Sequence, residues 1–154
     1  MNTQSRIRQL LIALITLFVG QTWAADLYVS PTGSQAGGGN WSTAYTNLQD
    51  ALQAASSTTT IHMAGGIYSL TDQITWTSSL SGVTVRGGYG AAGDEVLPGD
   101  NDPTQWPTIV TTAGTIKHRL FMLSGVQDVS IENITFTGAR NVKAAGADAR
   151  ALAA

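Results

Sequence analysis

The sequence contains no cysteine, so no disulfide bond can stabilise the fold. Charged residues are also scarce, at 12% of the chain, and proline occurs only four times. The residues that favour helices are few between positions 56 and 138, where glycine and threonine are common. Stability must therefore come from a buried core and from backbone hydrogen bonds, and the composition favours strands.

Basic residues are too few and too scattered for a nucleic-acid-binding protein. Without Arg6 and Arg8 near the N-terminus, six basic and ten acidic residues remain, a net charge of about −4. Binding to phosphates requires clustered Lys and Arg, so we expect no nucleic-acid partner. With only two histidines and no identified nucleophile, a Ser-His-Asp arrangement finds no support either.

Only one long apolar run is present, at residues 10–19. It follows Arg6 and Arg8 and precedes the small residues Ala24 and Ala25, an order typical of a secretory signal peptide. A membrane anchor is the alternative, but the run is shorter than the ~20 residues that a spanning helix needs. Residues 1–24 are therefore predicted to be a signal peptide, and the protein is expected to be secreted or at the cell surface.

Two further regions complete the predicted organisation. Residues 25–138 form the body, and residues 139–154 form a tail in which half of the residues are alanine and the strand pattern disappears. The tail is interpreted as a truncated, frame-shifted or disordered end, and the alternative is a short helix that covers the end of the body.

The clearest structural signal lies in residues 129–138, with the sequence VSIENITFTG. The segments 129–131 and 134–136 each alternate in polarity, and the alternation slips by one residue at Glu132-Asn133. Such a slip reverses the buried face unless the chain turns a corner, and asparagine tolerates the left-handed backbone of a corner. The pattern predicts two short strands joined by an asparagine corner.

Similar short strands follow one another from residue 60 onward. Residues 83–85 match residues 129–131, and Ile109 lies between them, with spacings of roughly 20–26 residues that suit a solenoid. The alternative is a β-sandwich, but neither Asn-Gly nor Asp-Gly is present to close its hairpins. The sequence therefore predicts an all-β fold, a short right-handed single-stranded parallel β-helix of few coils.

One segment of the body has helical periodicity, at residues 47–55. Its apolar residues recur on one face, namely Leu48, Ala51, Leu52 and Ala55. Thr46 is the expected N-cap, with Gln49 completing a capping box. This amphipathic helix is predicted to cap the first end of the strands.

From Leu27 to Gly138 the sequence resembles secreted right-handed parallel β-helix proteins of the polymorphic outer-membrane and pectate-lyase-like type. The resemblance is carried by LYVSPTGS, WSTAYTNLQDALQAA, TIHMAGGIYSL, VTVRGGYG, NDPTQWPTIV and VSIENITFTGA. It implies the N-terminal cap and first coils of such a fold. Members of this group cleave or bind polysaccharides, or serve as adhesins, and they usually continue for many more coils.

The long polar loop at residues 91–107 contains the candidate metal ligands Asp94, Asp100 and Asp102. Carboxylates in a flexible loop suit calcium, although the spacing is not that of an EF-hand. The alternative is an acidic loop that is simply solvated.

The candidate catalytic residues lie in the one basic cluster, at residues 117–119. In pectate-lyase-like enzymes a basic side chain removes a proton beside a uronate, so the resemblance makes Lys117 and Arg119 candidates for that base. The alternative is a charged turn before an apolar strand. His62 alternates with two apolar neighbours and is expected on the surface.

Tryptophans supply the candidate ligand-binding residues. Trp76 alternates with Ile74 and is expected in the core, whereas Trp41 and Trp106 lie in loops where an exposed ring could stack on a sugar. These features lead to two functional hypotheses. The first is a secreted or cell-surface module that binds polysaccharide and lacks a complete active site, its last coil covered by further coils or by a partner. The second is a fragment of a polysaccharide lyase.

Overall fold

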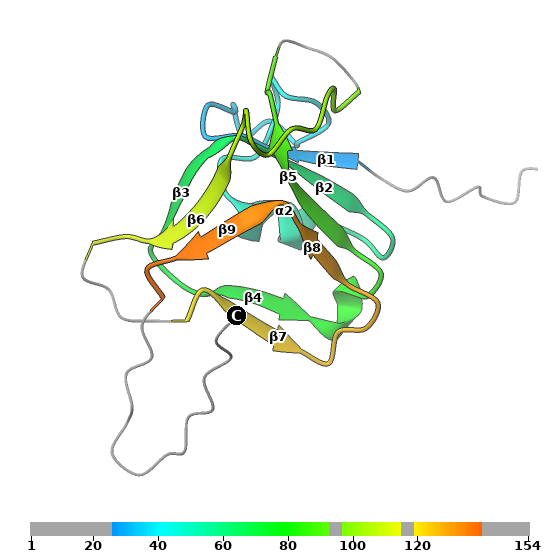
Figure 1. Ribbon diagram of the computed structural model, residues 1–154. Helices are drawn as coiled ribbons and strands as arrows, with labels where there is room; N and C mark the ends of the chain where they lie inside the picture. The colour runs from blue at the N-terminus through cyan, green and yellow to red at the C-terminus, as the bar shows by residue number, and fades with distance from the viewer. Residues whose placement is uncertain (1–25, 93–96, 115–118, 140–154) are drawn as a thin grey trace, which may run out of the picture.

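The computed structural model describes residues 26–92, 97–114 and 119–139, which form nine strands, one α-helix and one short 3-10 helix (Figure 1). The predicted signal peptide and most of the predicted tail lie outside these residues. In chain order the elements are β1 Asp26–Val29, α2 Leu48–Ala54, β2 Thr60–Ala64, β3 Gly66–Leu70, β4 Ile74–Thr77, η1 Ser78–Leu80, β5 Thr84–Tyr89, β6 Thr108–Thr112, β7 Phe121–Ser124, β8 Ser130–Glu132 and β9 Ile134–Thr137.

The strands belong to three parallel sheets that surround a common interior (Figure 1). Sheet A has the order β1-β2-β5-β8, sheet B has β3-β6-β9, and sheet C has β4-β7. From β2 onward, successive strands enter different sheets, and the strand three places later returns to the first. Every pairing between these strands is parallel.

The structure corrects the predicted fold class, a right-handed single-stranded parallel β-helix. The described residues form several separate short parallel sheets with one α-helix, and no closed or solenoid sheet is defined among them. The physical reason is that the hydrogen-bond ladders stop where the chain leaves each sheet. Gly66 and Asn133, with φ of 150° and 57°, lie where the chain passes from sheet A to sheet B.

The asparagine corner is confirmed, because Asn133 separates β8 from β9 and has the left-handed backbone. The match between residues 83–85 and 129–131 is also confirmed, since Thr84 pairs with Ser130 and Val85 with Ile131. Ile109 lies between these segments in the sequence, but it is not part of the same repeat. Ile109 pairs with Thr135 in sheet B, so it belongs to a different row of strands.

Helix α2 confirms the amphipathic segment but not its predicted cap. The cap is Asn47, whose side chain accepts a hydrogen bond from the Asp50 amide at 2.9 Å. Gln49 faces β4, where it accepts from the Thr75 amide at 2.8 Å and donates to the Thr75 carbonyl at 3.4 Å. The Gln49 side chain therefore bonds both the amide and the carbonyl of Thr75. These groups lie on the outer edge of β4, which has no neighbouring strand on that side in the described structure.

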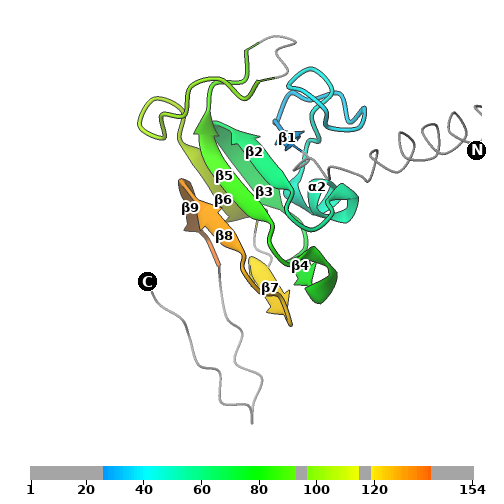
Figure 2. The ribbon, with the colours of Figure 1, turned by 90° about the vertical axis from the view of Figure 1, so that its right-hand side faces the viewer.

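The core lies between the three sheets and is closed at one end by α2. Leu48, Ala51 and Leu52 of the helix are buried in it. Trp76 is completely buried, as predicted, and donates from its indole nitrogen to the Leu80 carbonyl at 3.1 Å. Figure 2 shows α2 on one side of the molecule and β7, β8 and β9 on the other.

The described part of the chain contains no helix that is long and apolar enough to span a membrane.

Candidate functional site

The predicted catalytic and metal-binding residues are only partly covered by the structure. Lys117 and Asp94 lie outside the described residues, while Arg119, Asp100 and Asp102 are exposed. Nowhere in residues 26–92, 97–114 and 119–139 do three or more His, Asp or Glu side chains gather as a metal site would require. The calcium site and the lyase base therefore stay predictions.

Asp102 stabilises a turn within its own loop. Its carboxylate accepts hydrogen bonds from the amides of Thr104 at 2.9 Å and Gln105 at 3.2 Å, while its carbonyl accepts from the Trp106 amide at 2.8 Å. These bonds form a tight turn of the kind that aspartate side chains favour. The turn sets the position of Trp106, the residue that follows it.

Trp41 does not offer the exposed ring that its loop position suggested. It is 5% exposed and packs edge-on against Tyr28, with the ring centroids 4.8 Å apart. The glycine-rich loop at residues 33–40 folds back over sheet A. The Tyr28 amide donates to the Gly38 carbonyl, and the Asn40 side chain accepts from the Thr43 amide. The prediction that Trp41 binds ligand by stacking therefore lacks the accessible face that it needs.

His62 is likewise buried, contrary to the expected surface position. It points away from the main core, as the alternation predicted, but there it lies between the rings of Tyr28 and Tyr89, at centroid distances of 5.4 and 5.0 Å. These residues form a second buried cluster with Trp41, Ala44 and Ala64. The available sequence signal was the pair of ring-bearing residues at outward positions, Tyr28 and His62, which are register partners.

The two nitrogens of the His62 ring have different environments. Nε2 lies 2.9 Å from the Asp26 carboxylate, whereas Nδ1 is buried without a hydrogen-bond partner in the described structure. Burial lowers the pKa of His62, and the hydrogen bond to Asp26 opposes this effect only in part. A proton on Nδ1 would create a buried donor without an acceptor.

The free energy of unfolding is therefore expected to fall as the pH drops through about 6.5, the ordinary pKa of histidine. The unfolded chain takes up a proton there before the folded chain does, so acid favours unfolding. His62→Gln should flatten this dependence in urea titrations followed by circular dichroism between about pH 8 and pH 5. His118→Gln is the control, since it removes the only other histidine. An unchanged slope in the His62 variant would contradict the assignment.

Trp106 is the predicted ligand-binding residue that the structure places at a cleft. The cleft, here called the Trp106 cleft, has a volume of about 380 Å³ and lies near the carboxyl ends of β1, β2 and β5. Trp106 and Tyr89, Ser30 and Thr32, and Gly65 and Gly90 are among its lining residues. Trp106 is only partly buried, so part of its ring remains accessible.

Two glycines allow the close packing of Trp106. A Cβ atom built on Gly65 would come within 2.8 Å of Trp106, and one on Gly90 within 2.6 Å of its indole ring. The indole ring therefore rests against the bare backbone at Gly90, while Gly65 lies against the backbone and the Cβ atom of Trp106. Nothing in the sequence links these two glycines to Trp106.

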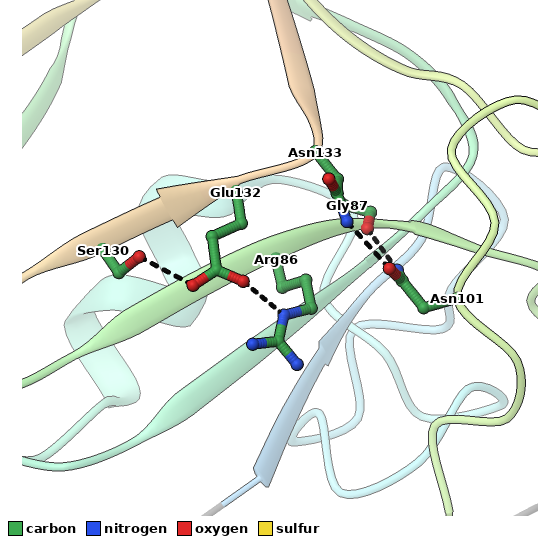
Figure 3. A network of polar contacts seen from close by, with 6 residues as sticks. All are labelled: Arg86, Gly87, Asn101, Ser130, Glu132 and Asn133. Atoms are coloured by element: carbon green, nitrogen blue, oxygen red, sulfur yellow. Dashed lines mark hydrogen bonds and ion pairs between the residues drawn. The ribbon is translucent and has the colours of Figure 1, made fainter.

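The loop that carries Trp106 is fixed to sheet A by a polar network (Figure 3). Asn101 donates to the Gly87 carbonyl at 2.6 Å, and Asn133 donates to the Asn101 side-chain oxygen at 2.8 Å. Beside them Arg86 donates to Glu132 at 2.7 Å. The Arg86 hydrogen bond is the main reason why the pKa of Glu132 lies below its usual value. The network joins the loop to β5 and to the corner between β8 and β9.

A second cleft, between α2 and β4, has a volume of about 470 Å³. Its lining includes Gln49, Thr75 and Leu80 but no aromatic residue. Gln49 already bonds both backbone groups of Thr75, so its polar atoms are engaged. We therefore regard the Trp106 cleft as the better candidate site.

Comparison with known proteins adds no relative: no protein-family model, no curated protein and no solved structure matches the chain. The functional conclusion depends on the chemistry of the cleft and on the pattern of the sequence.

Proposed function

We propose that this protein is an exported module that binds carbohydrate, either secreted or held at the cell surface, with Trp106 as the main contact. The observation that carries this proposal is the partly exposed indole ring at the edge of a cleft lined by hydroxyl groups and backbone. An aromatic ring offers an apolar face to the C–H groups of a sugar, and hydroxyl and backbone groups fix its orientation. The leader-like residues 1–24 support export.

The ligand is proposed to be a neutral sugar. Among the described residues, the lining of the Trp106 cleft includes no charged side chain. The neighbouring segment 91–107 contains four acidic residues and no Lys or Arg in its sequence. A uronate would be repelled by these acidic residues, and the nearby Arg86, which bonds the Tyr89 side chain, is already paired with Glu132. A neutral pyranose would lose nothing by Coulomb repulsion.

The test is calorimetric titration of the full-length exported protein with a panel of neutral oligosaccharides of glucose, xylose and mannose. Trp106→Ala should weaken binding by at least about tenfold, equivalent to ~1.4 kcal/mol, because it removes the stacking surface. Thr104→Ala is the matched control, since Thr104 is exposed in the same loop and contributes only its backbone amide to the turn. Both variants should keep the circular dichroism spectrum of the wild type.

Two results would contradict the proposal. One is an affinity that Trp106→Ala leaves unchanged while the protein stays folded. The other is release of unsaturated uronate from polygalacturonate with added calcium, which would support the lyase hypothesis instead.

A further inference from the structure

Ser30 and Thr32 both line the Trp106 cleft, and their hydroxyl groups differ in their exposure to solvent. Ser30 is only 2% exposed, whereas Thr32 is exposed. The two hydroxyl oxygens lie 3.1 Å apart, so one of them donates a hydrogen bond to the other. The direction of this bond decides which of the two hydroxyls keeps a proton that a ligand can accept.

The remaining bonds of Ser30 settle that direction. Its hydroxyl oxygen already accepts from the Thr32 amide at 3.3 Å. If Thr32 also donated its hydroxyl proton to Ser30, the buried Ser30 proton would need a different acceptor, and no other described group bonds the Ser30 hydroxyl. A buried donor without an acceptor is costly, so Ser30 donates to Thr32. The Thr32 hydroxyl therefore keeps its own proton at the surface of the cleft.

The backbone around Thr32 is held in place before any ligand binds. The Gly33 amide donates to the Ser30 carbonyl at 3.0 Å and closes a tight turn, while the Ser30 amide donates to the Tyr45 carbonyl at 2.8 Å. A Cβ atom at Gly33 would collide with the Ala44 carbonyl oxygen, so the turn lies directly against another segment. A group positioned in this way loses little conformational entropy when it bonds a ligand.

Tyr89 carries the third hydroxyl among the described lining residues, and its situation differs from that of Thr32. Tyr89 is almost completely buried, and its side chain bonds Arg86. Of the three lining hydroxyls in the described structure, that of Thr32 is thus the one on an exposed residue with a proton left to donate.

On the basis of the carbohydrate binding proposed above, we infer that Thr32 is a specificity-determining residue of the Trp106 cleft. The Thr32 hydroxyl donates its proton to an oxygen of the sugar that stacks on Trp106. Ser30 is a positioning residue, because its own proton occupies a lone pair of the Thr32 oxygen and turns the Thr32 proton toward the ligand. The cleft therefore discriminates against the deoxy sugar that lacks this oxygen, because the Thr32 donor then has no partner.

The experiment is calorimetric titration of the full-length exported protein with oligosaccharides of glucose, xylose and mannose, and with monodeoxy derivatives of the tightest binder. Thr32→Val should weaken binding by about fivefold, the effect of one net hydrogen bond. Thr32→Ser keeps the donor and should stay within about twofold of the wild type. One deoxy derivative should lose about fivefold against the wild type and nothing further against Thr32→Val, since both changes remove the same bond.

Two further variants separate the lost donor from a disturbed turn. Thr77→Val is the matched control, because it makes the same substitution at an exposed threonine that lines the other cleft, and it should leave the affinity unchanged. The double variant Ser30→Ala/Thr32→Val removes both hydroxyls, so no buried donor is left without an acceptor. It should bind like Thr32→Val, and all variants should keep the circular dichroism spectrum of the wild type.

The outcomes distinguish this role of Thr32 from the carbohydrate binding itself. If Trp106→Ala weakens binding but Thr32→Val does not, the role of Thr32 is overturned and the carbohydrate site stands. Equal losses for Thr32→Ser and Thr32→Val would also overturn it, since serine retains the donor. If no oligosaccharide binds, or if Trp106→Ala leaves the affinity unchanged, the proposed function fails and the role of Thr32 fails with it.

Discussion

Trp76→Ala should lower the free energy of unfolding by about 3–5 kcal/mol, the range for removing a buried aromatic side chain. Trp76 is completely buried in the core between the three sheets. Its indole nitrogen also donates to the Leu80 carbonyl at 3.1 Å, and alanine leaves that carbonyl without this donor. Since small domains have a total stability of about 5–15 kcal/mol, this one change would remove a large fraction of it.

Urea denaturation followed by far-ultraviolet circular dichroism measures this loss. Thr77→Ala is the control on the same strand, because Thr77 is exposed and its hydroxyl bonds the exposed Ser79 hydroxyl at 3.2 Å. The control should stay within about 0.5 kcal/mol of the wild type. A loss below about 1 kcal/mol for Trp76→Ala would mean that the site collapses around the smaller side chain or that the ring is not in the core.

Local features of this fold were predictable where the sequence pattern is itself local. Alternation places Trp76 inward, and the slip at Glu132-Asn133 locates a real corner. The apolar stripe of α2 is likewise a matter of spacing within one segment. In these cases the physical cause lies within a few residues, so one segment of sequence contains the evidence.

Strand pairing was less predictable, and the fold class was therefore wrong. Alternation says which face of a strand is buried but not which strand lies beside it. Ile109 was grouped with segments 83–85 and 129–131, whereas its strand β6 lies between β3 and β9. The described residues form several separate short parallel sheets, whereas the spacing had suggested one continuous β-helix.

The second buried cluster could not be read from the sequence because two distant segments create it. His62 faces outward from sheet A between Tyr28 and Tyr89, and the returning glycine-rich loop brings Trp41 into the same buried cluster. The position of Trp106 has a similar origin, since Gly65 lies against its backbone and Gly90 against its indole ring. A loop tryptophan is exposed or buried according to contacts that are distant in sequence.

Gly87→Ala is the second change expected to have a large effect, lowering the free energy of unfolding by about 1–3 kcal/mol through overpacking. Gly87 lies in β5 at the point where β6, the Trp106 loop and the Asn133 corner meet (Figure 3). A Cβ atom there would lie 2.4 Å from the Asn133 carbonyl oxygen and 2.8 Å from the Thr108 side chain. Neither neighbour can move freely. The Asn133 oxygen belongs to the backbone, and the Thr108 hydroxyl accepts from the Gly88 amide and donates to the Ala64 carbonyl.

The sign of the change in the free energy of unfolding shows whether this close contact matters, because replacing glycine by alanine without a clash has the opposite sign. In the absence of a clash, alanine stabilises a chain relative to glycine by about 0.4–1 kcal/mol, because it restricts the unfolded state. Gly39→Ala is the matched control, since a Cβ atom at Gly39 meets nothing within 4 Å and its backbone is not left-handed. Urea denaturation of both variants should therefore show destabilisation for Gly87→Ala and a neutral or opposite change for Gly39→Ala. Equal effects would show that the close approach of Asn133 and Thr108 to Gly87 does not determine stability.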